Sequence, residues 1–259
     1  MIQVLARAFG ILEGLSSKGS ASVKELAVLT GLKKSTLCNI LRTLLDLGCL
    51  TKTERGSYRL GPKLGEIARP QLQQDALARL GREAVLALAD ASGEAAQVVV
   101  LRDGERYIMA EGRSRRDLIV NTVKLGITAV GSATGRVLLA YQDEAALKEA
   151  VRKAQARGGE TGESLSELKE ALKKTRKDGL SENRPRDREV VGLGVPVFCG
   201  AEVAAALGVY LPSVRFRGKH RTEVIELLRR AGKELSLRLS AEVGGPTAGP
   251  AETAQMLKE

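Results

Sequence analysis

The sequence predicts a two-domain α+β protein: a helical N-terminal part, then an antiparallel sheet flanked by helices. Up to about residue 91, apolar residues recur mainly at three- and four-residue intervals, the spacing of helices with one buried face. From Gly93 onward, strand-like apolar runs separated by turn residues alternate with helical segments, an order typical of an antiparallel α+β domain. The length of 259 residues suits two domains of about 100–200 residues each.

The first helix, predicted over residues 2–16, carries apolar residues on two lines. A helix that is apolar on two sides is buried on two sides. We therefore expect one side to pack on the rest of the N-terminal domain and the other against a partner chain. The two lines are Ile2, Leu5, Phe9 and Leu12, and Val4, Ala8, Ile11 and Leu15.

Two short helices joined by a glycine turn follow this first helix. Ser22 and Glu25 have the spacing of a capping box, which begins a helix at Val23, and Gly31 suits the left-handed backbone that ends it. The second helix is predicted to begin at Lys34. Its buried stripe is expected to be Leu37, Ile40, Leu41, Leu44 and Leu45.

A ribbon completes this region, because residues 48–60 alternate as two short strands around a turn at Arg55-Gly56-Ser57. Helix, turn, helix and ribbon make a winged helix-turn-helix, whose second helix enters the major groove of DNA. The helix pair alone is also compatible with a helical hairpin that has a solvated polar face, and the ribbon favours DNA binding. Groups that bond phosphates and base edges predict DNA contacts at Lys33, Lys34, Ser35, Thr36, Asn39, Arg42, Thr43, Lys52 and Arg55.

A long helix over residues 63–91, broken or kinked at Pro70, is expected to link the domains. The first predicted domain, residues 1–69, holds the DNA-binding head and the start of the linker helix. The second, residues 70–242, is the α+β domain, and residues 243–259, rich in Gly and Pro, are predicted to form a flexible tail. Within the second domain the expected strands are 95–101, 106–110, 190–198 and 203–210, and the expected helices are 132–141, 144–156, 165–177 and 222–241.

The composition favours a nucleic-acid-binding protein of the cytoplasm. A net charge of +10 and a pI near 9.7 indicate a polyanionic partner. Residues 1–68 hold ten basic and five acidic residues, so half of the excess, +5, lies in about a quarter of the chain. Neither a signal-peptide pattern nor an apolar run of about 20 residues is present, so we expect no membrane partner.

Catalysis is not predicted. The three cysteines, Cys38, Cys49 and Cys199, are too few and too unevenly spaced for a disulfide framework. His220, the only histidine, lies in a basic stretch and is expected at the surface, so neither a metal site nor a Cys–His pair is predicted. Gly192-Leu193-Gly194 lacks the Lys-Ser/Thr pair and the following helix of a phosphate loop. We expect no enzymatic activity and no cofactor.

A series of short motifs runs from about Val4 to Leu239: Arg7-Ala8-Phe9, Ile11-Leu12, Glu25-Leu26-Ala27, Gly31 to Thr36, Leu47-Gly48, Tyr58 to Gly61, Gly135, Leu138-Leu139-Ala140, Lys177-Asp178-Gly179, Val195-Pro196-Val197 and Ala205-Ala206-Leu207. In this order and spacing they resemble the isocitrate lyase regulator (IclR) family of bacterial transcription factors. The resemblance implies a homodimer or tetramer, a GAF-like C-terminal domain that holds a small-molecule effector, and repression or activation of a nearby operon.

The resemblance also implies an effector pocket, at which this sequence departs most from the family. The matching positions are Ala133, Thr134, Glu182 (or Asp187 if a gap falls differently), Gly192, Gly208 and Tyr210. A cysteine and two serines of relatives that bind small oxo-acids are here Gly192, Gly208 and Tyr210. Two interpretations follow: a roomier, less polar pocket capped by Tyr210 that takes an organic metabolite, or glycines that serve strand packing around a narrowed pocket.

Asn39 also departs from the family pattern, since that position is more often Arg in relatives. Its amide is expected to bond adenine in place of a phosphate or guanine contact. An alternative function for the whole chain is a dimeric DNA-binding protein whose C-terminal domain only joins subunits and binds no effector. Either protein would require a pseudo-palindromic operator, because two heads related by a two-fold axis contact half-sites about one helical turn apart.

Overall fold

The computed structural model describes residues 2–113, 116, 128–156, 164–184 and 189–244. The chain divides between Leu72 and Gln73 into two compact units. The predicted tail began at Val243, but Val243 and Gly244 are the last residues of a helix; from residue 245 onward the tail lies outside the described residues.

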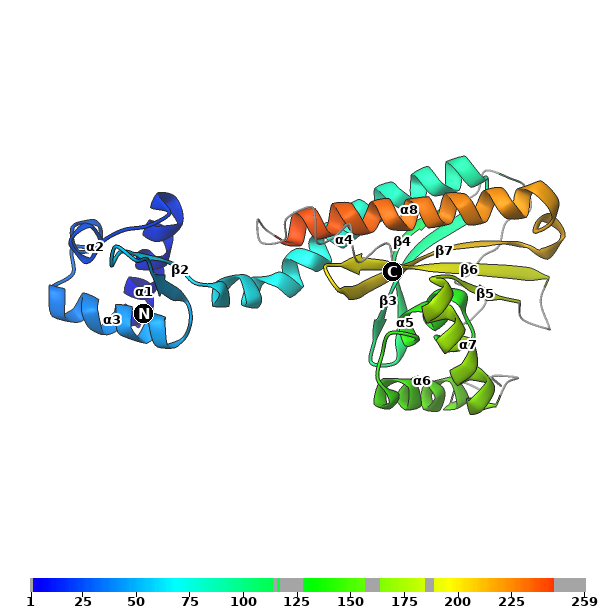
Figure 1. Cartoon of the computed structure of the whole chain (residues 1–259), viewed down its shortest axis with the longest axis horizontal. Helices are drawn as coiled ribbons and strands as arrows, with labels where there is room; N and C mark the ends of the chain where they lie inside the picture. The colour runs from blue at the N-terminus through cyan, green and yellow to red at the C-terminus, as the bar shows by residue number, and fades with distance from the viewer. Residues whose placement is uncertain (1, 114–115, 117–127, 157–163, 185–188, 245–259) are drawn as a thin grey trace. The chain divides into compact units, whose positions relative to one another are not determined.

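The first unit has the predicted winged helix-turn-helix elements (Figure 1). Ser22 accepts from the backbone N–H of Glu25 and the Glu25 side chain accepts from that of Ser22, so the capping box is confirmed. Gly31 ends the helix that begins at Val23, and its backbone is left-handed with φ 65°. The elements are α1 (Gln3–Lys18), α2 (Val23–Thr30), α3 (Lys34–Asp46), β1 (Leu50–Lys52) and β2 (Tyr58–Leu60).

The core of the first unit is built from the predicted stripe of α3, the inner side of α1 and the ribbon. Its buried members are Ile11, Leu15, Ala21, Leu26, Leu37, Ile40, Leu41, Leu44, Cys49, Leu50 and Tyr58. On the outer line of α1, Ile2 is 70% exposed, Leu5 56% and Phe9 63%, whereas Leu12 of the same predicted line packs against the core. Val4, from the other predicted line, is also exposed.

The second unit contains a five-stranded antiparallel sheet with the order β4-β3-β7-β6-β5. Its strands are β3 (Ala95–Arg102), β4 (Glu105–Gly112), β5 (Ser181–Asn183), β6 (Val190–Cys199) and β7 (Glu202–Pro212). The three-residue edge strand β5, which pairs with Gly192–Gly194, was not predicted from the sequence. So short a polar segment has no alternation from which a strand can be predicted.

Helices cover both faces of this sheet (Figure 1). They are α4 (Pro62–Ser92), α5 (Ala133–Leu139), α6 (Glu144–Ala156), α7 (Leu165–Asp178) and α8 (Gly218–Gly244), with a short 3-10 turn η1 (Ser213–Arg215) before α8. Pro70 lies inside α4 without ending it, so of the predicted break or kink the break is wrong.

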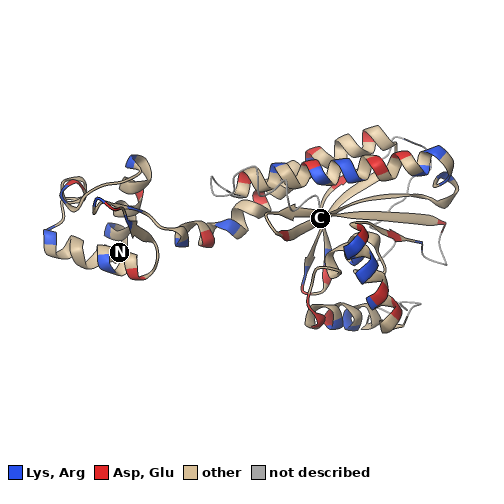
Figure 2. Cartoon of the chain, viewed as in Figure 1, with Lys and Arg blue, Asp and Glu red and all other residues tan. Residues whose placement is uncertain are grey.

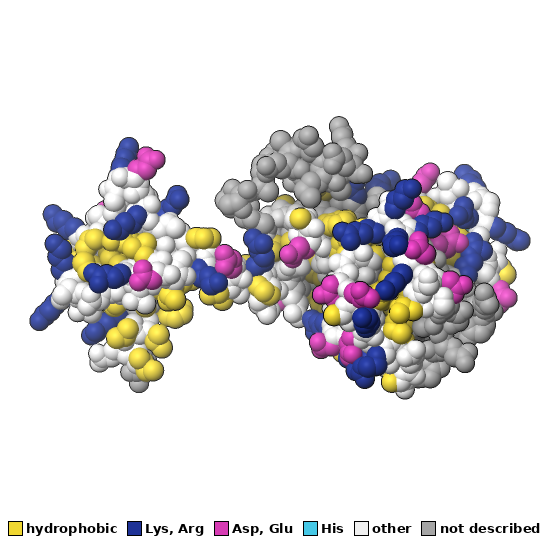
Figure 3. Space-filling model, turned by 60° about the horizontal axis from the view of Figure 1, so that its bottom comes forward, with side chains coloured by type: hydrophobic (Ala, Val, Ile, Leu, Met, Phe, Trp, Pro, Cys, Tyr) yellow, Lys and Arg dark blue, Asp and Glu magenta, His cyan; other side chains and the backbone are white. Residues whose placement is uncertain are grey.

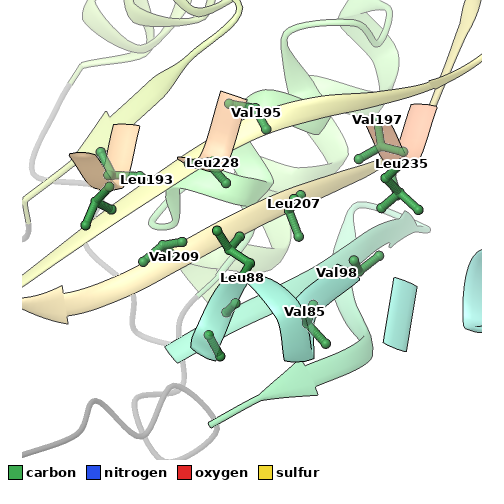
Figure 4. Close-up of a cluster of buried hydrophobic side chains, with 14 of the residues drawn as sticks. Val85, Leu88, Val98, Leu193, Val195, Val197, Leu207, Val209, Leu228 and Leu235 are labelled. Atoms are coloured by element: carbon green, nitrogen blue, oxygen red, sulfur yellow. The ribbon is translucent and has the colours of Figure 1, made fainter. Parts of the chain in front are cut away.

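The main core of the second unit lies between the sheet and the helix pair α4–α8 (Figure 4). Val85 and Leu88 of α4 and Leu228 and Leu235 of α8 meet the strand side chains on this face. Strand residues alternate, so the next residues along each strand face α5. On that side Val99 and Ala206 pack against Val137 and Leu138. The sheet is therefore buried on both faces.

Candidate DNA-reading surface and C-terminal cluster

The polar face of α3 lies open opposite its buried stripe. Leu37, Ile40, Leu41 and Leu44 are buried, which turns the other side of the helix outward. Lys33, Lys34 and Arg42 make no ion pair with any described residue. We call the following set the DNA-reading surface; all are exposed except Thr36, which is half-buried: Lys33, Lys34, Ser35, Thr36, Asn39, Arg42 and Thr43.

The N-terminus of α3 adds to the positive character of this surface. Lys33 occupies the N-cap position and its side chain makes no capping hydrogen bond. The first backbone N–H groups of the helix are consequently left without a side-chain acceptor, and the helix dipole places partial positive charge there. Such an end is suited to a phosphate oxygen. Figure 2 colours the Lys and Arg positions along α3 blue.

The ribbon β1–β2 presents the two further predicted cations. Lys52 and Arg55 are exposed, and the ammonium of Lys52 lies 5.3 Å from the centroid of the Tyr58 ring. Gly56 takes φ 77° in the connecting turn, a backbone conformation that residues other than glycine rarely adopt. Apolar side chains also lie open on the first unit (Figure 3). This unit therefore combines a basic surface with an apolar one.

The C-terminal residues singled out from the sequence fall into one cluster and one outlier. Ala133 and Thr134 begin α5, and Tyr210 of β7 is paired in register with Gly192 of β6. The Tyr210 hydroxyl lies 2.8 Å from Thr134 Oγ1. We call Ala133, Thr134, Gly192, Gly208 and Tyr210 the C-terminal cluster.

The ring of Tyr210 fills the space beside the cluster's glycines. Tyr210 is only 2% exposed. A Cβ atom added at Gly192 would lie 3.1 Å from a ring carbon of Tyr210, and one at Gly208 would lie 2.4 Å from Thr134 Cγ2. The two glycines therefore allow α5 and the Tyr210 ring to pack directly on the strands.

Glu182, the predicted acid, does not join the cluster. It is paired with Leu193, which packs in the core beneath α4 and α8, whereas the neighbouring Gly192 faces α5. Because side chains alternate along strands, Glu182 points to the other face of the sheet. There it accepts from Arg184 at 2.8 Å and Arg221 at 3.5 Å. Asp187, the alternative acid, lies outside the described residues.

Two polar residues on the α5 face of the sheet, Gln97 and Arg106, were not predicted from the sequence. Gln97 is fully buried and is paired in register with Gly208. Its side-chain oxygen accepts from Nη2 of Arg106 at 2.9 Å. A glutamine within the apolar run AAQVVVL was the available signal, since a polar group inside a buried strand needs a partner.

His220 is less exposed than the sequence suggested. Its Nε2 lies 3.0 Å from the buried carboxylate of Glu94, which also accepts from Nε of Arg215 at 2.8 Å. This trio ties the residue before β3 to η1 and to the first turn of α8. Among the described residues, no group of three or more His, Cys, Asp or Glu side chains could hold a metal ion. None of the described helices is long and apolar enough to cross a membrane.

Comparisons with known proteins agree with this arrangement. Residues 4–54 match the family model described as the IclR helix-turn-helix domain, and residues 71–237 match that of the bacterial transcriptional regulator IclR C-terminal domain. The chain belongs to the IclR family. It is a DNA-binding transcriptional regulator, and members of this family are not enzymes, as the sequence predicted.

Relatives match along most of their length. The transcriptional regulator KdgR of Dickeya chrysanthemi is 25% identical over 241 residues, covering 91% of this chain and 79% of that protein. KdgR of Escherichia coli K12 is 24% identical, covering 92% and 93%. Among crystal structures, an IclR regulator of Silicibacter sp. TM1040 has a TM-score of 0.57 at 22% identity, covering 92% and 96%. The Thermotoga maritima IclR structure has a TM-score of 0.54 at 21% identity, covering 93% and 100%. These structures have the same α+β fold.

Proposed function

We propose that this regulator binds a specific operator by placing α3 in the major groove, with Arg42 on phosphate or guanine and Asn39 on adenine. The observation that carries the proposal is the DNA-reading surface, which is open and basic because the opposite side of α3 is held in the core. Lys52 and Arg55 of the ribbon would contact phosphates beside the groove.

We also propose that the protein works as a homodimer or as a dimer of dimers. The exposed outer line of α1, with Ile2, Leu5 and Phe9, supports this, because adjacent open apolar side chains on a soluble unit mark an association surface. A two-fold pair of heads requires a pseudo-palindrome with half-sites about 10 base pairs apart, or a multiple of that spacing.

For the C-terminal domain we propose effector sensing at the C-terminal cluster, with an organic metabolite that displaces the Tyr210 ring. The cluster lies where α5 meets β6 and β7, and Thr134 and Tyr210 would supply its hydroxyl groups. A second candidate is a C-terminal domain that only joins subunits. The burial of Tyr210 and its bond to Thr134 favour this candidate, since the ring already occupies the space between the glycines.

Operator selection tests the DNA-binding proposal. The full chain would be used to enrich sequences from a randomised duplex at low ionic strength, followed by anisotropy titrations of the enriched duplex at several salt concentrations. We expect inverted half-sites and an affinity that falls steeply with salt, because each neutralised phosphate releases counterions. If no sequence is enriched, or the protein ignores all DNA at low salt, the proposal is wrong.

A metabolite screen by thermal shift separates the two C-terminal candidates, because a ligand that binds only the folded state raises the melting temperature. Wild type and Tyr210→Phe should be screened in parallel, since the phenylalanine keeps the ring but not the bond to Thr134. A compound that stabilises the wild type and changes operator affinity supports effector sensing. A library with no such compound supports the subunit-joining candidate.

A further inference from the structure

The guanidinium of Arg106 has an unused donor in the interior of the second unit. Nη2 donates to Gln97, but the Nε–H is buried and has no acceptor among the described residues. Buried N–H groups in native proteins nearly always have a partner, so an orphaned donor is expected to bind water or an acceptor from outside the chain. An arginine presents its donors as a planar fork, which suits an oxyanion better than a single carbonyl.

Arg106 is one of the residues that line a small recess. This recess is formed by the β3–β4 hairpin, the turn at Thr128–Ala129 and helix α6, and its volume of about 10 Å³ holds one water-sized atom. Its apolar walls come from Gly104, Ala129, Ala150 and Ala154, and its polar groups from Glu105, Arg106, Thr128 and Lys153. The recess thus has room for one oxygen of a ligand whose remainder stays outside.

The residues that line the recess carry more positive than negative charge. Arg106 makes no ion pair with a described residue. The carboxylate near Lys153 is Glu149, at 3.8 Å, and Arg152 already holds that group at 2.7 Å. Glu105 is the one acid in the lining, and it has a further interaction of its own. Two cations therefore face a single acid.

We propose that this recess is an oxyanion site, in which one oxygen of a carboxylate or phosphate accepts from Arg106 Nε and lies near the ammonium of Lys153. The site lies outside the C-terminal cluster. Gln97 links the two, because its side chain holds Arg106 and its backbone is paired with Gly208. The proposal concerns binding to the protein alone and does not depend on operator recognition.

Calorimetric titration of the full chain with sodium phosphate and with sodium acetate, in sodium chloride of matched ionic strength, tests the site. We expect saturable binding of at least one oxyanion, and the two arms distinguish phosphate from carboxylate. At an oxyanion concentration tenfold above Kd, the melting temperature should rise by roughly 3–6 °C relative to chloride.

A matched pair of variants on α6 shows whether the recess is responsible. Lys153→Gln removes one of the two lining cations and should weaken oxyanion binding about tenfold, the factor that about 1.4 kcal/mol corresponds to. Arg152→Gln removes a neighbouring cation that is paired with Glu149 and does not line the recess, so it should bind like the wild type. Arg106→Gln should abolish binding; if that variant fails to fold, the α6 pair still decides, since Lys153 is partly exposed.

Three results would overturn the proposal. Equal stability in oxyanion and chloride would mean that the recess holds water only. Wild-type binding by Lys153→Gln would place any anion elsewhere. Equal weakening in Lys153→Gln and Arg152→Gln would indicate a general effect of surface charge. These measurements contain no DNA. They therefore test the oxyanion site even if the proposed operator binding turns out to be wrong.

Discussion

The DNA-reading surface and the C-terminal cluster were both predicted from short patterns, yet one is open and the other is filled. On α3 the cations point outward and make no ion pair with described residues. In the cluster, Ala133 and Thr134 are fully buried and Tyr210 is 2% exposed. The same kind of sequence evidence therefore led to one exposed surface and one packed interior.

The difference lies in the sequence distance over which each arrangement is determined. The exposed face of α3 follows from leucines three or four residues away on the same helix. Whether Gly192 and Gly208 leave a cavity depends on Thr134 and Tyr210, which come from separate elements 76 positions apart. A glycine in a strand creates space only where no neighbour moves into it.

Replacing Tyr210 by alanine should have the largest effect and tests whether the cluster is packed core. Removing a fully buried aromatic ring costs about 3–5 kcal/mol of the free energy of unfolding. The fall should appear in thermal or urea unfolding of the full chain. Operator affinity, measured below the lowered melting temperature, should change by less than about twofold, because the reading surface belongs to the other unit.

Tyr107→Ala is the matched control for that variant, since this tyrosine of β4 is 44% exposed. A surface substitution of this kind should cost less than about 1 kcal/mol. If Tyr210→Ala proves as mild as the control, the ring is dispensable to the fold and effector displacement becomes the favoured account. An equal loss of self-association and DNA affinity would instead assign Tyr210 to a core that holds the whole assembly.

Gly208→Ala probes the same packing from the backbone side. The new methyl would lie 2.4 Å from Thr134 Cγ2 and 2.8 Å from the Leu193 carbonyl oxygen, so α5 and β6 must move. Overpacking of this kind costs about 1–3 kcal/mol. Gly65→Ala in α4 meets nothing within 4 Å and should be neutral or stabilise by up to about 1 kcal/mol, as alanine does in helices.

Adding Thr134→Ser to Gly208→Ala sharpens that measurement, because serine lacks the Cγ2 that the new methyl would meet. The double variant should recover part of the lost free energy of unfolding, while the clash with the Leu193 carbonyl remains. Strict additivity of the two changes, measured by chemical unfolding, would show that the two side chains do not meet.

Arg42→Ala tests the open half of the comparison. Loss of one phosphate or base contact should weaken operator binding by roughly tenfold and lower the slope of log affinity against log salt by about 1. Lys219→Ala removes the same charge from the second unit and should leave both quantities unchanged, apart from a small effect of net charge. Unchanged affinity and slope for Arg42→Ala would mean that this face of α3 does not meet DNA.

Local signals were enough to predict much of the fold. The capping box at Ser22, the left-handed Gly31 and the stripe from Leu37 to Leu44 lie within one or two helical turns of the features they determine. The family model over residues 71–237 confirmed what the motif order had indicated for the C-terminal part. These sequence patterns predict structure correctly because each involves residues that are close together in the chain.

Features that depend on long-range pairing were missed or misplaced. The face of Glu182 follows from the register of β5 with β6, which no local pattern of three residues determines. The partnership of Gln97 with Arg106 depends on the pairing of β3 with β4 and on the length of an arginine side chain. His220 was expected at the surface because its neighbours are basic, but the buried Glu94 that attracts it comes from the other end of the unit.

The smallest predicted effect concerns the ion pairs that join α4 to α8. Hydrogen bonding from Arg238, followed by its charge and that of Arg79, holds the pKa of Glu83 below its usual value of 4.5. A carboxylate with a lowered folded pKa stabilises the native state above its unfolded pKa and loses that contribution as the pH falls through the folded pKa. Because Glu83 is exposed, the contribution is small and screened by salt.

Glu83→Gln should therefore be slightly less stable than the wild type at neutral pH, and the difference should shrink below about pH 4.5 and vanish as the pH falls through the lowered pKa of Glu83 in the folded state. The measurement is the urea midpoint of both proteins across pH 3–7 at low ionic strength. Glu234→Gln on α8, which makes no ion pair with the described residues, is the control and should follow the wild type at every pH. A Glu83→Gln difference that persists at low pH would assign the residue a packing role in place of an electrostatic one.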